Sequence, residues 1–124
     1  MRSYRDHDVW QAFKTLVEAC YRTSRQFSRE QMYGVTTQIR RASFSIPATT
    51  AAGYVRKTTR SRSQFLRIAQ GSLKELETHF KPAERVKILG QADSAKLLFE
   101  CQRVSRMLRN QSKALRSKLE LETA

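Results

Sequence analysis

Basic side chains dominate the middle of this sequence, and the chemistry best suited to them is the binding of phosphate. From residue 31 to residue 74 there is no aspartate or glutamate, but there are eight lysines and arginines. The planar guanidinium group of arginine forms paired hydrogen bonds with phosphate and stays charged at physiological pH. The residues predicted to contact nucleic-acid phosphates are Arg40, Arg41, Arg56, Lys57, Arg60, Arg62 and Arg67.

The densest part of this region is residues 56–63, in which basic residues alternate with serine and threonine. It falls between two predicted helices, where hydroxyl groups and the free N–H groups of a helix start can add phosphate contacts. Because unrelieved like charge destabilises a fold, we interpret this cluster as a binding surface. Contacts of this kind position a nucleic acid without reading its base sequence.

A second group of basic residues recurs at intervals of three or four near the end of the chain, on one face of a predicted helix. Its members are Arg103, Arg106, Arg109, Lys113 and Arg116. Two interpretations stay open for this stripe. It is either a second phosphate-binding surface or the solvated outer face of a helix, since outward charge is normal on helical bundles.

Residues able to support catalysis or bind metal are few. The two histidines, His7 and His79, have no serine or cysteine nucleophile pattern near them. Glu75 and His79 are four residues apart, whereas carboxylate bundles that hold metals use Glu-x-x-His. The sequence therefore predicts a protein that is not an enzyme and holds no metal and no cofactor.

The length and charge of the chain limit its class. Its 124 residues predict a single domain spanning 1–124, and 24 basic against 11 acidic residues give a net charge of +13. No stretch is apolar enough for a secretory signal or a membrane span, so we expect a cytoplasmic protein that does not enter a membrane. Cys20 and Cys101 lie outside any Cys-x-x-Cys pattern and are expected to be reduced core residues.

Four amphipathic helices are expected to position these side chains, at about residues 8–27, 30–56, 60–81 and 93–119. In the first, apolar or small side chains recur every three or four residues from Val9 to Phe27, with Asp8 as the N-cap. The last carries a leucine-rich seam, with Asp93 as its N-cap. Short links between such helices favour an all-α, antiparallel, up-and-down four-helix bundle.

Prolines and glycines modify this pattern. Pro47 lies inside the second helix and predicts a kink near Ser43, with a true break as the alternative. Pro82 is expected to end or bend the third helix. Gly71 predicts a close approach of another helix, because a glycine in the middle of a helix has a cost that packing must offset.

Three segments resemble the bacterial four-helix-bundle proteins encoded in intervening sequences of large-subunit (23S) ribosomal RNA genes. They are residues 8–11 (DVWQ), 33–47 (YGVTTQIRRASFSIP) and 65–77 (FLRIAQGSLKELE), and the similarity extends over about residues 6–119. One departure is residues 48–53 (ATTAAG), where the family commonly reads SNIAEG. The loss of the acidic residue makes this helix more basic.

The resemblance implies a ring-like homopentamer. It also implies a relation to retroelement accessory (variability determinant) proteins, which bind a reverse transcriptase and nucleic acid. The family's characteristic positions, with roles in either packing and assembly or binding, are Gln38, Arg40, Arg41, Gly53, Gly71, Ser72, Glu75 and Glu77.

Together these patterns predict a non-enzymatic, oligomeric accessory protein that binds the phosphate backbone of RNA or DNA. The alternative is a protein-interaction scaffold whose basic surface meets an acidic partner, such as a polymerase or reverse transcriptase. The two hypotheses differ in whether a protein partner is retained after nuclease treatment.

Overall fold

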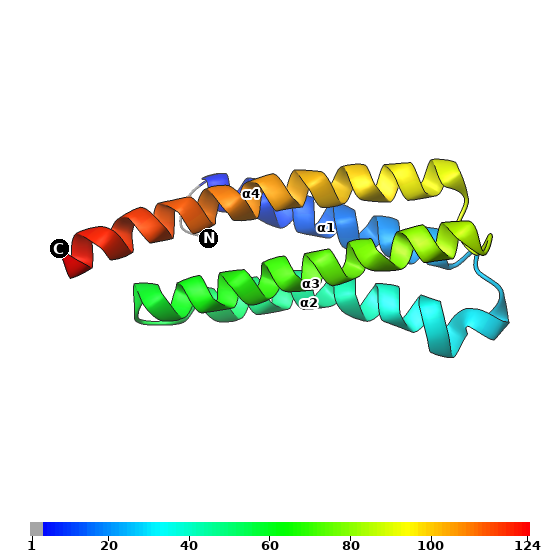
Figure 1. Ribbon diagram of the computed structural model, residues 1–124, viewed down its shortest axis with the longest axis horizontal. Helices are drawn as coiled ribbons and strands as arrows, with labels where there is room; N and C mark the ends of the chain where they lie inside the picture. Colours follow the sequence, from blue (N-terminus) through cyan, green and yellow to red (C-terminus); the bar gives the residue numbers. More distant parts are fainter. Residues whose placement is uncertain (1–3) are drawn as a thin grey trace.

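The structure of the chain, a computed structural model that describes residues 4–124, contains four long α-helices and no strand in that range (Figure 1). The helices are α1 (Tyr4–Ser24), α2 (Thr37–Tyr54), α3 (Thr59–Arg85) and α4 (Gln91–Thr123). Two short helical turns, η1 (Arg29–Gln31) and η2 (Met32–Thr36), join α1 to α2. The predicted all-α four-helix bundle is confirmed.

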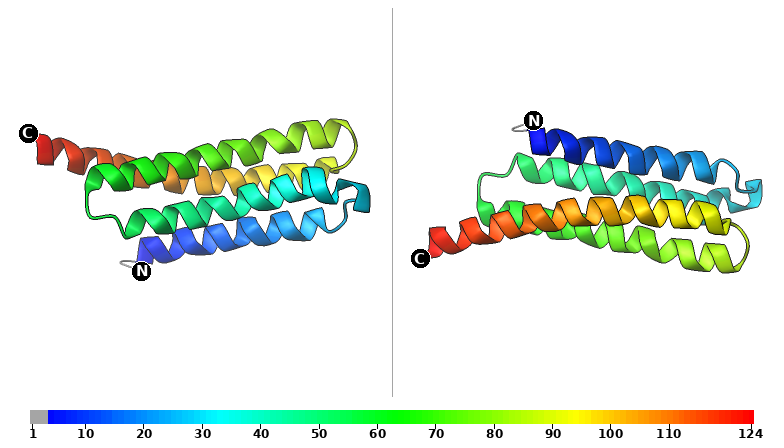
Figure 2. Two further views of the ribbon diagram at one scale, coloured as in Figure 1. Left: turned by 90° about the horizontal axis from the view of Figure 1, so that it is seen from below. Right: turned by 90° about the horizontal axis from the view of Figure 1, so that it is seen from above.

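Each helix packs against two others. Both α1 and α3 contact α2 and α4. The chain reverses direction at each connection, so α1 and α3 run one way along the molecule and α2 and α4 run the other way (Figures 1 and 2). As a result, the α2–α3 connection and the start of α1 lie at the same end of the molecule as the last turns of α4.

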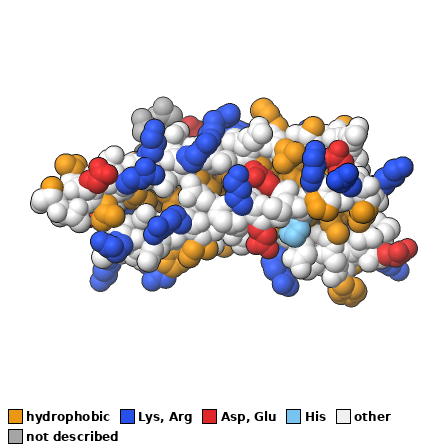
Figure 3. All heavy atoms as spheres, viewed as in Figure 1, with side chains coloured by type: hydrophobic (Ala, Val, Ile, Leu, Met, Phe, Trp, Pro, Cys, Tyr) orange, Lys and Arg blue, Asp and Glu red, His pale blue; other side chains and the backbone are white. Residues whose placement is uncertain are grey.

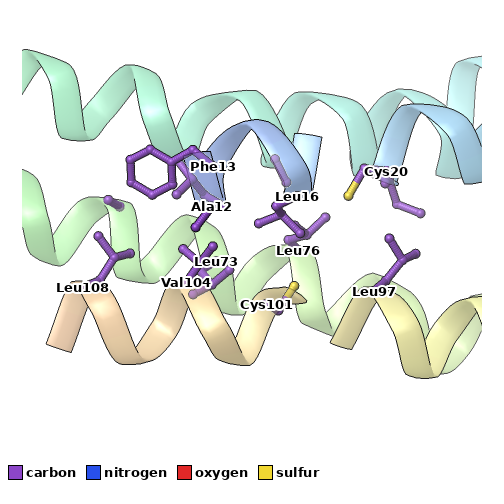
Figure 4. Packing of buried hydrophobic residues seen from close by; sticks show 14 of the residues in the cluster. Ala12, Phe13, Leu16, Cys20, Leu73, Leu76, Leu97, Cys101, Val104 and Leu108 are labelled. Atoms are coloured by element: carbon purple, nitrogen blue, oxygen red, sulfur yellow. The ribbon is translucent and has the colours of Figure 1, made fainter. Parts of the chain in front are cut away.

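The core is a continuous cluster of apolar side chains from all four helices (Figure 4). Phe13 and Leu16 of α1 meet Leu76 of α3 and Leu97 and Leu108 of α4 in this cluster, and all five are fully buried. Burial of a side chain of this size contributes about 1.5–3 kcal/mol to stability. The stripes with a spacing of three and four residues therefore supply much of the driving force for folding, as the sequence predicted.

Both cysteines belong to this core and are unpaired, as expected. Burial raises the pKa of the Cys20 thiol to about 12, although a hydrogen bond with the Ser43 side chain lowers it in part. Burial also raises the pKa of Cys101, and the nearby Cys20, Glu77 and Glu100 raise it further. Both thiols are thus held in the protonated, unreactive form at neutral pH.

The predicted starts of the first two helices were wrong. Helix α1 begins at Tyr4, so Asp8 lies inside the helix and is not its N-cap, and the helix ends at Ser24 instead of residue 27. Helix α2 begins at Thr37 instead of residue 30, because Gly34 has φ −120° and ψ −109°, outside the helical region. Glycine adopts such a conformation readily, and Gly34 interrupts the helical backbone within η2, before the regular helix begins.

Helix α2 continues without interruption through Pro47, so the alternative of a break was wrong. The kink stays a prediction. The ring of Pro47 removes the N–H that would reach the carbonyl of Ser43. The hydroxyls of the neighbouring serines donate elsewhere: that of Ser43 to the carbonyl of Arg40 at 2.8 Å, and that of Ser45 to the carbonyl of Ala42 at 2.9 Å.

The last two helices are longer than predicted. Helix α3 passes Pro82 and ends at Arg85 instead of residue 81, which buries Ala83 in the core. Lys87 follows with a positive φ of 64°, the left-handed conformation that commonly terminates helices. Helix α4 begins at Gln91 with Gly90 as its N-cap, so Asp93 lies in the first turn and does not cap the helix.

The close approach of two helices occurs at Gly53 and not at Gly71. A Cβ atom added to the buried Gly53 would lie 3.0 Å from the Cβ atom of Phe65 on α3. Gly71 is exposed, and an added Cβ atom there would meet nothing within 4 Å. The predicted helix contact at Gly71 is therefore wrong for the isolated chain.

Candidate nucleic-acid interface

The seven basic residues predicted to bind phosphate lie at three separate places. Arg40 and Arg41 lie near the start of α2, beside the end of α1. Arg56, Lys57, Arg60 and Arg62 surround the α2–α3 connection, at the other end of α2 and about 20 Å away. Arg67 lies further along α3. These residues were predicted together as phosphate contacts, but the length of α2 places Arg40 and Arg41 far from the α2–α3 connection.

Arg40 is used within the fold. Its Nε donates a hydrogen bond to the Ser24 hydroxyl at 2.9 Å, and its guanidinium carbon lies 4.7 Å from the centre of the Tyr21 ring. Both contacts tie α2 to α1, and Arg40 is only partly exposed. The neighbouring Arg41 is exposed. Arg40 therefore has a structural role that the sequence did not reveal.

The α2–α3 connection is an organised turn. The Arg62 Nε donates to the Arg56 carbonyl at 3.0 Å, and the Arg56 guanidinium lies 4.4 Å from the centre of the Phe65 ring. Thr58 caps α3 by accepting a hydrogen bond from the Ser61 N–H at 3.1 Å. Lys57 and Arg60 extend from this turn into solvent.

A strongly basic hollow lies between α3 and α4. This α3–α4 groove has a volume of about 670 Å³. It is lined by Arg67, Gln70, Arg106, Arg109, Asn110, Ser112, Lys113 and Arg116. Figure 3 views this side of the molecule and shows lysine and arginine side chains on both helices. Arg67 therefore belongs with the stripe of α4, four of whose five members line the groove.

The basic residues of α3 also follow a regular interval. Arg60, Arg67, Lys74 and Lys81 are seven residues apart, and all four are exposed. Seven residues make nearly two helical turns, so these side chains share one face at a spacing of about 10.5 Å. On α4, Arg109 and Arg116 have the same interval. The signal was present in the sequence, but sequence reasoning missed it.

Few of these cations are neutralised within the chain. Among the side chains that the structure describes, none of the seven predicted residues and none of the α4 residues lining the groove forms an ion pair with a carboxylate. Among the described side chains, ion pairs join Lys74 to Glu77 at 3.6 Å and Arg103 to Glu100 at 3.8 Å. The charge of the groove is thus available to an external anion.

The remaining family positions lie apart from this groove or at its edge. Gln38 and Glu75 are exposed, Ser72 is partly buried, and Glu77 is held by Lys74. His79, two residues further along α3, has a buried Nε2 atom without a hydrogen-bond partner. In residues 4–124, no three histidine, cysteine, aspartate or glutamate side chains are grouped in a way that would hold a metal ion.

The fold and the groove define the class of the protein as a basic, all-α helical bundle with a groove of arginine and lysine side chains on its surface. The family is defined by sequence: the model of the 23S rRNA-intervening sequence protein family matches residues 5–110, and the chain belongs to that family. A comparison with curated proteins finds no match to the chain. In the described part of the chain, no helix combines the length and apolarity that crossing a membrane requires.

Proposed function

We propose that this protein is a non-enzymatic accessory factor that binds the phosphate backbone of a nucleic acid in the α3–α4 groove. The observation that carries the proposal is the convergence of Arg67 with four cations of α4, none of them ion-paired among the described side chains. In this proposal the main phosphate contacts lie in the groove and not at the α2–α3 connection. The connection adds further cations at one end of the groove.

The chemistry of the lining supports recognition of phosphate over recognition of bases. Besides cations, the groove offers the amides of Gln70 and Asn110 and the hydroxyl of Ser112, all of which donate hydrogen bonds to phosphate oxygens. No aromatic residue lines it, although proteins that bind single strands commonly stack bases on aromatic rings. We therefore expect binding with little sequence preference.

We further propose that the protein acts as a homo-oligomer in the cytoplasm, with the pentamer implied by the family resemblance as the expected form. Three exposed apolar side chains support contact between copies: Phe44 on α2, Val55 in the α2–α3 connection and Ile68 on α3. A pentamer would carry five times +13, about +65, and a bound polyanion would offset that charge.

The proposal is tested by titrating nuclease-treated protein against labelled RNA and DNA duplexes of about 20 base pairs, roughly twice the length of the basic face of α3. Fluorescence anisotropy at low salt should show binding to the duplexes. The variant Arg106→Glu, Lys113→Glu should lose at least about tenfold in affinity, since both side chains line the groove.

The matched control is Arg22→Glu, Arg25→Glu, which makes the same change in charge at exposed positions near the end of α1. Equal losses in the two variants would show an effect of net charge alone and would refute the groove. Absence of binding by the unmodified protein, together with retention of an acidic protein after nuclease treatment, would favour the scaffold alternative.

A further inference from the structure

The last turns of α4 lie outside the part of the chain that matches the family. The match ends at residue 110, whereas α4 continues to Thr123. In Figures 1 and 2 this part of α4 extends beyond the ends of the other three helices. Its residues from 116 onward are exposed except for the partly buried Leu119, so it is held weakly.

One contact ties this segment to the α2–α3 connection. The Thr59 hydroxyl donates a hydrogen bond to the Glu122 carboxylate, with 2.8 Å between Oγ1 and Oε1. Thr59 is the first residue of α3, where the helix dipole favours negative charge. The exposed cations Lys57 and Arg60 lie within two residues of Thr59 in sequence. A carboxylate thus occupies the position at which the sequence predicted contacts with phosphate.

We infer that residues 117–124 are an internal competitor for nucleic acid. Their two acidic side chains, Glu120 and Glu122, lie on the last turn of α4 and bring negative charge to the cationic α2–α3 connection. A phosphate backbone entering from the α3–α4 groove competes for the same donors and displaces the segment. This inference rests on the proposed function, because the competing ligand is the nucleic acid assigned to the groove.

The low cost of displacement supports this inference. Within residues 117–124, Glu122 makes one hydrogen bond to a side chain of another helix, and Leu119 alone is partly buried. A phosphate chain offers several negative charges, whereas the segment offers two acidic side chains, one of which is offset by the charge of Lys118. Binding therefore replaces a weak internal contact by stronger external ones.

The test compares two variants that each remove two carboxylates. Glu120→Gln, Glu122→Gln removes the competitor, whereas Glu18→Gln, Glu30→Gln changes exposed positions on α1 and in η1. We expect the first variant to bind the RNA duplex about twofold to tenfold more tightly than the second at low salt, and the difference to vanish at high salt. Thermal unfolding of both variants checks that they are folded.

Hydrogen exchange supplies a second measurement on the unmodified protein. Addition of the duplex should accelerate amide exchange in residues 117–124. If the two variants bind with equal affinity and the unmodified protein also binds, the inference is overturned but the proposed function is not. Unchanged exchange in the bound state would also overturn it. If neither the unmodified protein nor either variant binds, both proposals fail, whereas binding by the Glu120, Glu122 variant alone supports the competitor.

Discussion

Gly53 and Gly71 both occupy positions characteristic of the family, but they differ in how closely other side chains approach them. At Gly53 the helices α2 and α3 lie so close that a Cβ atom would be 3.0 Å from that of Phe65, whereas Gly71 faces open space. Alanine is the better helix former by up to about 1 kcal/mol at either site. What differs is the steric cost, which arises only at Gly53.

Alanine substitution at the two sites should therefore change stability in opposite directions. Gly53→Ala should lower the free energy of unfolding by about 1–2 kcal/mol, because overpacking outweighs the gain in helix propensity. Gly71→Ala should raise it by about 0.5–1 kcal/mol. Urea unfolding of both variants measures the effects. A destabilising Gly71→Ala, accompanied by loss of assembly, would instead place Gly71 in a contact between copies.

The buried cysteines make stability depend on pH in the alkaline range. In the unfolded chain the Cys20 thiol ionises near its ordinary pKa of 9.0, but burial raises its pKa in the folded protein to about 12. Between these values the unfolded state binds fewer protons, so stability is fully present below pH 9 and falls as the pH rises towards 12.

Chemical denaturation at pH 8 and at higher pH should show this loss, and the variant Cys20→Ala, Cys101→Ala should show less of it. The variant serves as a baseline for the part of the pH dependence that does not come from the thiols. An identical pH dependence in the variant would contradict the assigned role of the thiols. At neutral pH both thiols should react with iodoacetamide only after unfolding.

At the scale of the elements, helical periodicity identified which side chains are buried. Leu97, Cys101, Val104 and Leu108 of the predicted α4 seam are fully buried, whereas Leu115 and Leu119, further along the same seam, are only partly buried. The spacing of apolar residues along a helix predicts which face is buried, but it does not predict where the neighbouring helices end. The extension of α4 past the other helices was for this reason not predictable.

The groove could not be predicted from the sequence either. Arg67 and Arg106 are nearly 40 residues apart, and their meeting depends on how α3 is aligned along α4. That alignment follows from the lengths of both helices and of the link between them. The predicted end of α3 and the predicted start of α4 were both wrong by a few residues. The sequence could therefore suggest basic residues on each helix, but not that they line one groove.

Pro47 interrupts the hydrogen bonding of α2 without interrupting the helix. It leaves the carbonyl of the buried Ser43 without its usual N–H partner from four residues ahead. Pro47→Ala should restore that bond and raise the free energy of unfolding by about 1–3 kcal/mol, as measured by urea denaturation. A neutral or destabilising effect would contradict the cost assigned to the missing hydrogen bond of the Ser43 carbonyl.

For the whole molecule, charge and assembly are linked. A pentamer would have five times the chain mass of 14.4 kDa, about 72 kDa, and would bring five grooves together. Light scattering should give this mass at high salt, where repulsion between the cationic chains is screened. A mass of one chain at all protein concentrations would contradict the proposed oligomer while leaving the groove of each chain intact.

The proposed function requires that cations of the α3–α4 groove replace counterions on a phosphate backbone. The most direct measurement is the slope of the logarithm of the binding constant against the logarithm of salt concentration for a DNA duplex. The variant Arg109→Gln, Arg116→Gln should make this slope less negative by about 1.8 relative to the unmodified protein, because each lost phosphate contact changes it by about 0.9. The control Arg22→Gln, Arg25→Gln should retain the original slope. Equal slopes for all three proteins would contradict the proposed function.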